Sequence, residues 1–317
     1  MELETLREDI SRALNKEECG AEFYFLLSTI DGLTVKRADL DQSAQSELSS
    51  NFIESVSNSI LLDDDISLIE LSSADDRKGA IYRYDLDETP EQLRHLSEVL
   101  EREDFSTFDF TQDELAKLKG IIVLLGHGKE QLVLYKHQYP IALFKRDTGL
   151  FVRKRNENRL GKVSEDILRI SSTFEFFRIG EHYYICNIKA LERFFGFHNA
   201  IMNLAKEGLK NVKDSGLLED LTVLDARMND ISFARKLVRA SKNSPVLGEI
   251  PNVEIITFIT HHPALKGRIN ISEDGAKLSL KSKASQNLFL KLLNDDFLQS
   301  ELTKLHYASS AKDPVSD

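Results

Sequence analysis

The apolar residues of this chain are divided into short runs, and this division limits what the chain can fold into. Ile121–Leu125 is among the longest runs, whereas a membrane-spanning helix needs about 18 consecutive apolar residues. The acidic start MELETLREDI lacks the basic and apolar regions of a signal peptide. We therefore expect a globular cytoplasmic protein that does not insert directly into a membrane.

The first part of the chain mixes helical and strand patterns. Leu3, Leu6, Ile10 and Leu14 recur at helical spacing, and a later aromatic-rich run is typical of a strand. We expect helices over residues 3–14, 42–60 and 90–100, and strands over residues 23–27, 66–71 and 80–84. Residues 1–119 are thus predicted to form an acidic α+β domain with mixed α/β character.

The second part begins with short strands and ends with helices. Strands are expected over residues 121–125, 131–137, 141–144, 151–153, 174–179 and 183–186, and helices over residues 188–195, 197–213, 217–224 and 231–241. Alternation over residues 132–137 predicts a sheet that is partly exposed on one side. We expect residues 120–312 to form an antiparallel β-meander packed with a helical carboxy-terminal part, followed by a disordered tail over residues 313–317.

One segment, residues 144–162, is strongly basic. It has two acids, Asp147 and Glu157, and a net charge of +5. Its cations are Lys145, Arg146, Arg153, Lys154, Arg155, Arg159 and Lys162. A polyanion is one partner that this charge suits. A solvated hairpin is the alternative, because exposed lysines and arginines also protect strand edges from unwanted pairing.

The charge of the chain is unevenly divided. Residues 1–119 carry 12 Lys and Arg against 29 Asp and Glu, a net charge of −17, whereas residues 120–317 have a net charge of +6. The acidic part would repel nucleic acid, and the basic part could hold it. A second cluster, which includes Arg235, Lys236 and Arg239, could contact phosphates or form an ordinary solvated helix face.

Three features invite a catalytic or metal-binding interpretation. Asp63–Asp65 with Asp76 and Lys78 resembles the carboxylate spacing of metal-dependent nucleases, but Asp76 and Lys78 fall in an expected turn. Residues 126–129 match only fragments of a phosphate loop, and a hairpin turn explains them better. His261 and His262 are adjacent, so they would point apart in a strand. We therefore expect no catalytic residues, no metal and no cofactor.

The blocks ISSTFEFFRIGEHYYICNIKALERFFGF and ISEDGAKLSLKSKASQNLFLKLLNDDFLQSELT and the closing HYASSAKD resemble the KwaB subunit of bacterial Kiwa anti-phage systems. The resemblance covers about residues 120–312. It implies a non-enzymatic, DNA-binding effector that acts with KwaA, a membrane subunit, to restrict phage DNA. Beside this resemblance, the basic segment and the second basic cluster are candidate DNA contacts.

The functional expectation is an anti-phage defence protein that binds DNA largely independently of sequence. With its membrane partner it would block phage DNA replication or expression, and that partner would recruit it to the inner membrane. We also expect a homo-oligomer, namely a dimer. Two alternatives stay open: a metal-dependent nuclease effector, and a non-catalytic scaffold that does not touch DNA.

Overall fold

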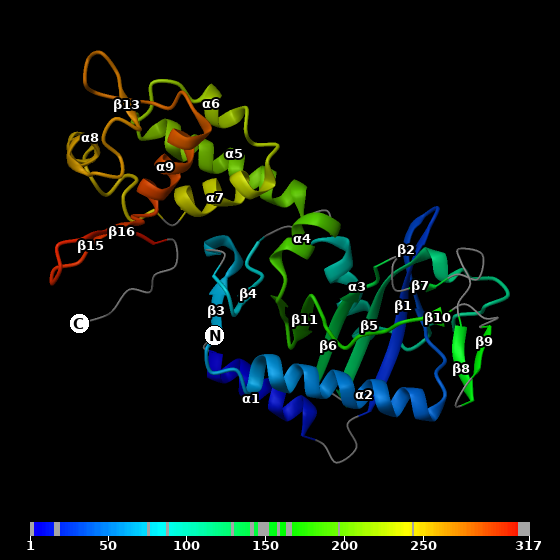
Figure 1. The fold of residues 1–317 in the computed structure, drawn as a ribbon. Helices are drawn as coiled ribbons and strands as arrows, with labels where there is room; N and C mark the ends of the chain where they lie inside the picture. The colour runs from blue at the N-terminus through cyan, green and yellow to red at the C-terminus, as the bar shows by residue number, and fades with distance from the viewer. Residues whose placement is uncertain are drawn as a thin grey trace. The chain divides into compact units, whose positions relative to one another are not determined.

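The computed structural model (Figure 1) describes residues 3–15, 20–74, 77–86, 89–127, 130–139, 143–144, 152–156, 159–162, 167–195, 197–242 and 244–309. The chain forms two compact units, Met1–Leu68 with Glu91–Ile188, and Ile69–Pro90 with Lys189–Asp317. The boundary expected at residue 119 lies within β5 (Leu118–His127) of the first unit. Since β5 pairs with β1 (Ala21–Thr29), the sheet itself joins the two sides of that boundary. The expected tail lies outside the described residues.

The first unit contains a run of six antiparallel strands in the order β2-β1-β5-β6-β11-β12. Those not yet introduced are β2 (Gly32–Arg37), β6 (Glu130–His137), β11 (Phe176–Ile179) and β12 (His182–Ile185). With its helices, this sheet confirms the predicted α+β class. Strand β2 adds to the expected strands, and the turn at Asp31-Gly32 joins it to β1 as a hairpin.

Strand β6 is buried on both faces, so the predicted one-sided exposure is wrong. Leu132, Val133, Leu134 and Tyr135 are all buried. Helix α1 (Leu3–Leu14) packs on β5 and β6, and α3 (Glu91–Glu101) packs on β6 and β11. Packing by these helices buries residues that alternation alone would have placed in solvent.

Glycine at position 120 lets the centre of this sheet close. A Cβ atom there would lie 2.4 Å from the Tyr135 hydroxyl oxygen. Tyr135 in turn stacks on Phe176 of β11, with ring centroids 4.3 Å apart and planes at 5°. The missing side chain of Gly120 therefore makes room for an aromatic stack that ties β6 to β11.

The long helix of the first unit differs from the expected one at its end. Helix α2 (Gln42–Val56) begins at Asp41, whose side chain accepts a hydrogen bond from Ala44 N at 2.8 Å, as an N-cap does. It continues into a π-helical turn, η1 (Ser57–Leu61). Phe52, Val56 and Ile60, spaced four residues apart, are buried along it, so the helix has one apolar face against the core.

The second unit is mainly helical. Its helices are α4 (Ile188–Phe194), α5 (His198–Asp214), α6 (Thr222–Asp225), α7 (Ile231–Lys242), α8 (Asn252–His261) and α9 (Lys283–Leu293). Its short strands include the neighbours β3 (Ser67–Glu70, which begins in the first unit) and β4 (Ala80–Arg83), and the pairs β13 (Asn270–Ile271) with β14 (Leu278–Ser279) and β15 (Phe297–Gln299) with β16 (His306–Ala308).

Two details of the second unit depend on contacts distant in sequence. Helices α5 and α7 approach so closely that a Cβ at Gly208 would lie 2.1 Å from the Ser241 hydroxyl oxygen. The helix expected over residues 217–224 is shortened to α6. Its first residues instead bond to β14, because Leu278 N donates to Leu217 O at 2.9 Å and Glu219 N donates to Leu278 O at 3.0 Å.

Candidate nucleic-acid interface

The basic segment lies within a set of nested hairpins. Strand β6 pairs with β11. Between them along the chain, β7 (Leu143–Phe144) pairs with β10 (Ile167–Leu168), and between those, β8 (Val152–Asn156) pairs with β9 (Arg159–Lys162). We call residues 138–175, which connect β6 to β11, the arm. The expected meander therefore does not extend through the arm. There β7 pairs with β10, and the β8–β9 pair lies between them along the chain.

The innermost hairpin brings five of the predicted cations onto two adjacent strands. Arg153, Lys154 and Arg155 are in β8, whereas Arg159 and Lys162 are in β9. The register pairs Val152 with Lys162, Arg153 with Gly161, Lys154 with Leu160 and Asn156 with Arg159, with an irregularity between Lys154 and Asn156. Neither described strand contains an acid. Lys145 and Arg146 lie outside the described residues.

Buried polar residues lie where the arm joins the sheet. Lys136, at the end of β6, and Glu175, just before β11, are both buried. Lys136 Nζ donates to Thr173 Oγ1 at 3.0 Å, and His137 N donates to Glu175 Oε2 at 2.6 Å. These hydrogen bonds join the last residues of β6 to residues just before β11, so they fix the geometry at the base of the arm.

Burial controls protonation at this junction. It lowers the pKa of Lys136 and raises the pKa of Glu175, although each charge partly offsets the effect on the other. Burial and then the nearby Lys119 and Lys136 lower the pKa of His137 to about 4. His137 is thus neutral at physiological pH. Sequence reasoning missed this cluster, and its one signal was a run of polar residues directly after a buried strand.

The second predicted cluster is not a uniform basic face. Arg235 is 3% exposed, and its Nε donates to Glu192 Oε1 at 2.7 Å while Nη1 donates to Ala74 O at 3.4 Å. The prediction that it contacts DNA is therefore wrong for this structure, because its guanidinium is inside the unit. Lys236 is exposed and Arg239 is half-buried.

Exposed lysines also follow α5. Lys206, Lys210 and Lys213 are all exposed, in keeping with their i, i+4 and i+7 spacing along one helix. With Lys236 they give the second unit its own set of exposed cations.

The nuclease pattern is spread over ordinary turns. Asp63 Oδ1 accepts a hydrogen bond from Asp65 N at 3.0 Å, and its carbonyl accepts one from Arg7 Nη2 at 2.6 Å. Asp64 and Lys78 are exposed, while Asp76 lies outside the described residues. In the part of the chain that the structure describes, no three His, Cys, Asp or Glu residues are grouped as metal ligands.

The two remaining motifs have structural roles. Residues 126 and 127 end β5, and His127 pairs with Glu130 across a hairpin, as the sequence predicted for this segment. His261 ends α8 and His262 is its C-cap, so the two residues lie at a helix end and not in a strand. His262 is buried among Phe258, Phe297 and His306, with ring centroids 4.7 to 5.2 Å away.

Comparisons with known proteins agree on one family. The family model described as Kiwa protein KwaB-like matches residues 115–303. Kiwa protein KwaB from Escherichia coli O55:H7 (strain RM12579 / EPEC) is 33% identical over 319 aligned residues, which cover 100% of both chains. No solved structure matches the chain. Over the described ranges, every helix is too short or too polar to cross a bilayer.

Proposed function

We propose, from the premise that this chain belongs to the KwaB family of Kiwa anti-phage defence proteins, that it binds DNA through the β8–β9 hairpin. The observation that carries this proposal is the hairpin itself. It holds Arg153, Lys154, Arg155, Arg159 and Lys162 on two paired strands, without an acid among the described residues. Arg235 is not part of the proposed interface.

Binding by this hairpin would depend on charge rather than on base sequence. Each Lys or Arg that neutralises a phosphate releases condensed counterions, so affinity falls steeply as salt rises. The guanidinium of arginine can also hold two phosphate oxygens at once. No base-reading motif occurs in the segment. Such a surface suits recognition of invading DNA whatever its sequence.

The proposed action has a second component, a membrane partner. We propose that KwaA recruits the chain to the inner membrane, and that the DNA-bound complex blocks phage DNA replication or expression. The acidic residues 1–119, with a net charge of −17, are the proposed docking region, since cytoplasmic loops of membrane proteins are rich in Lys and Arg. A homodimer is the proposed state of the chain.

Two other functions make different predictions. A metal-dependent nuclease would use Asp64, Asp76 and Lys78 on a bound cation, and a scaffold would need no DNA contact. Incubation with plasmid and Mg²⁺ separates them from the proposal. Retarded, intact plasmid supports a non-enzymatic DNA-binding protein, nicked plasmid supports the nuclease, and unretarded plasmid supports the scaffold.

The decisive variant is the triple change Arg153→Glu, Lys154→Glu and Arg155→Glu. We expect it to abolish gel retardation of duplex DNA at about 0.1 M salt, because three attractive contacts become repulsive. Wild-type binding should weaken by a similar factor on duplexes of unrelated sequence as salt increases.

A matched control reverses three exposed cations elsewhere, Lys266→Glu, Lys281→Glu and Lys283→Glu. It changes the net charge by the same amount, so retained retardation would show that the position of the charges matters. Circular dichroism checks that both variants fold. Unchanged DNA affinity in a folded β8–β9 variant would contradict the proposed interface.

A further inference from the structure

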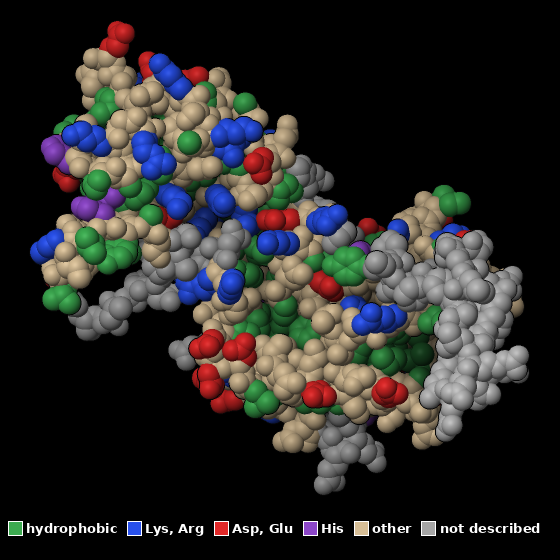
Figure 2. All heavy atoms as spheres, in the orientation of Figure 1, with side chains coloured by type: hydrophobic (Ala, Val, Ile, Leu, Met, Phe, Trp, Pro, Cys, Tyr) green, Lys and Arg blue, Asp and Glu red, His purple; other side chains and the backbone are tan. Residues whose placement is uncertain are grey.

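A groove of about 820 Å³ opens in the first unit. Its walls are β1, the first half of α2, the segment 108–115 and the end of the arm at β10. Figure 2 shows hydrophobic side chains recessed above α2, with carboxylate side chains along α2 below them. The volume is in the range of about 300 to 1,000 Å³ that is typical of ligand pockets.

Three aromatic rings that contact one another line the groove, and the last of them is exposed to solvent. Phe25 and Phe108 are buried and make an edge contact with centroids 5.3 Å apart. Phe108 makes another with Phe110 at 5.0 Å, yet Phe110 is 76% exposed. Ile167 of β10 also lines the groove and is exposed. Exposed apolar side chains gathered in one concavity are typical of a binding surface.

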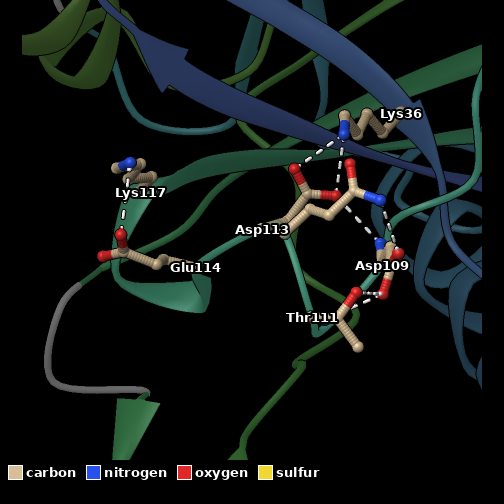
Figure 3. Close-up of polar contacts among 7 residues, drawn as sticks. Lys36, Asp109, Thr111, Asp113, Glu114 and Lys117 are labelled. Carbon is tan, nitrogen blue, oxygen red and sulfur yellow. Dashed lines mark hydrogen bonds and ion pairs between the residues drawn. The ribbon is translucent and has the colours of Figure 1, made fainter.

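Hydrogen bonds hold the wall that carries Phe110 in place (Figure 3). Lys36 Nζ donates to both carboxylate oxygens of Asp113, at 2.6 and 2.8 Å, and Asp109 N donates to Asp113 Oδ2 at 2.8 Å. Asp109 Oδ1 accepts from both N and Oγ1 of Thr111, at 2.8 and 2.7 Å. Phe108 N also donates to Arg37 O at 2.8 Å. The wall is therefore tied to β2 and is preformed.

The carboxylates in this wall are ionised at neutral pH. Hydrogen bonds from Thr111 lower the pKa of Asp109. Burial opposes ionisation of Asp113, but its hydrogen bonds with Asp109 and Lys36 outweigh burial, and its pKa is also lowered. The hydrogen bonds of this wall therefore favour the ionised form of both carboxyl groups.

The rim of the groove is mainly acidic. Among the lining residues that the structure describes, Asp39 and Glu47 are exposed acids and Arg169 is the one cation. DNA phosphates would be repelled by the two carboxylates, whereas Lys or Arg next to an apolar anchor would be attracted. The combination of apolar floor and acidic rim fits an apolar protein segment with basic flanks.

We infer that this groove docks a segment of a partner protein, in which two or three apolar side chains are flanked by Lys or Arg. The apolar side chains would pack against Phe110 and Ile167, and the basic ones would face Asp39 and Glu47. This inference rests on the proposal that the acidic residues receive a basic partner, and it identifies the surface that does so.

The test begins with random 12-residue peptides displayed against the immobilised full-length protein. We expect the enriched peptides to combine apolar residues with a net positive charge. Synthetic fluorescein-labelled copies of them should bind Phe110→Asp at least about tenfold more weakly in fluorescence polarisation, as when an anchoring contact is lost. The pair Asp39→Lys and Glu47→Lys should weaken binding about threefold or more and reduce its salt dependence.

The matched control is Ile30→Asp. Ile30 is a fully exposed apolar residue at the turn between β1 and β2, outside the groove lining, so this change should leave peptide affinity as it is. No enriched peptide, enriched acidic peptides, or equal affinity for Phe110→Asp would each overturn the inference. The inference would also be overturned if the wild type bound a single-stranded oligonucleotide, or a second copy of the chain in sedimentation equilibrium, and Phe110→Asp abolished that binding.

Two further measurements separate this inference from the proposed function. If the chain never sediments with membranes in the presence of the membrane partner, the proposed partner is wrong. If it does so and Phe110→Asp changes nothing, the groove is wrong while the partner stands. Gel retardation by Phe110→Asp should be unchanged, because Phe110 is not one of the β8–β9 cations.

Discussion

At the scale of single residues, Arg235 shows that a cation in a basic stretch can serve the fold. Its neighbour Lys236 is exposed, but Arg235 lies on the inner side of α7 and forms an ion pair with Glu192. A buried guanidinium is tolerated only where its charge and N–H groups have partners. The Glu192 carboxylate and the Ala74 carbonyl meet that need, so Arg235 stabilises the second unit.

We expect Arg235→Ala to lower the free energy of unfolding by about 3 kcal/mol, because it leaves Glu192 without its buried partner. Urea unfolding followed by circular dichroism measures this. Lys236→Ala is the control and should change stability by less than about 0.5 kcal/mol. DNA affinity per folded molecule should be unchanged in Arg235→Ala. A stable Arg235→Ala variant that no longer binds DNA would return Arg235 to the interface.

His137 predicts a pH dependence of stability. Its pKa is lowered to about 4 in the folded chain, against about 6.5 in an unfolded one. Between about pH 4 and pH 6.5, the unfolded state binds a proton at His137 that the folded state does not bind. The contribution of His137 to stability is therefore present above about pH 6.5 and is lost as pH falls toward about 4. We therefore expect His137→Gln to lose less stability than the wild type between about pH 7 and pH 5.5. Urea unfolding at both pH values tests this, and equal losses would show that His137 is not the source.

At the scale of elements, the nested pairing makes the arm a separable part of the first unit. The β7–β10 pair lies between β6 and β11 along the chain, and the β8–β9 pair lies between β7 and β10. Because β6 pairs directly with β11, the hydrogen bonds of the main sheet do not depend on the inner pairs. The junction residues Lys136, Thr173 and Glu175 are outside the β7–β10 pair along the chain. The base of the arm thus belongs to the core, and the β8–β9 hairpin lies beyond it along the chain.

We expect the replacement of residues 145–166 by Asn-Gly to preserve the fold. Phe144 and Ile167 are direct partners in the β7–β10 pair, and two residues of this type close such a pair in a hairpin turn. The melting temperature should change by only a few degrees, and gel retardation of DNA should be lost. An unfolded product would show that the basic hairpin is required for the core. A folded product that still retards DNA would place the interface elsewhere.

At the scale of the whole molecule, the two proposed binding sites carry opposite charges. The acidic residues 1–119 contribute the rim of the groove, and the arm contributes the β8–β9 cations. Because exposed charges act over only about 8 Å at physiological salt, local charge decides partners more than the net charge of −11. One chain can therefore offer a polyanion and a basic protein separate sites.

Fractionation of cells tests the proposed route to the membrane. Expressed alone, the chain should stay in the supernatant, since its acidic residues are repelled by anionic lipid headgroups. Expressed with the membrane partner, it should sediment with membranes. If the chain alone sediments and resists a high-salt wash, it attaches to lipid directly and the proposed recruitment is wrong.

Local pattern was enough to predict a large part of the fold. Helix α1 and the apolar face of α2 follow from spacing within a few residues, and the hairpin of β11 and β12 follows from its short glycine turn. The α+β class and the family also followed from the sequence. These features depend on neighbours along the chain, so the sequence displays them directly.

Only the tertiary structure decided which distant segments meet. The Lys36–Asp113 contact spans 77 residues and the Arg235–Ala74 contact spans 161, so no local periodicity predicts the groove wall or the burial of Arg235. The pairing of β6 with β11 around the arm is equally non-local. The sequence by itself determined many of the elements, the charges and the family, whereas long-range packing decided which of the described charges are exposed, because burial depends on what covers a residue and not on its neighbours in the chain.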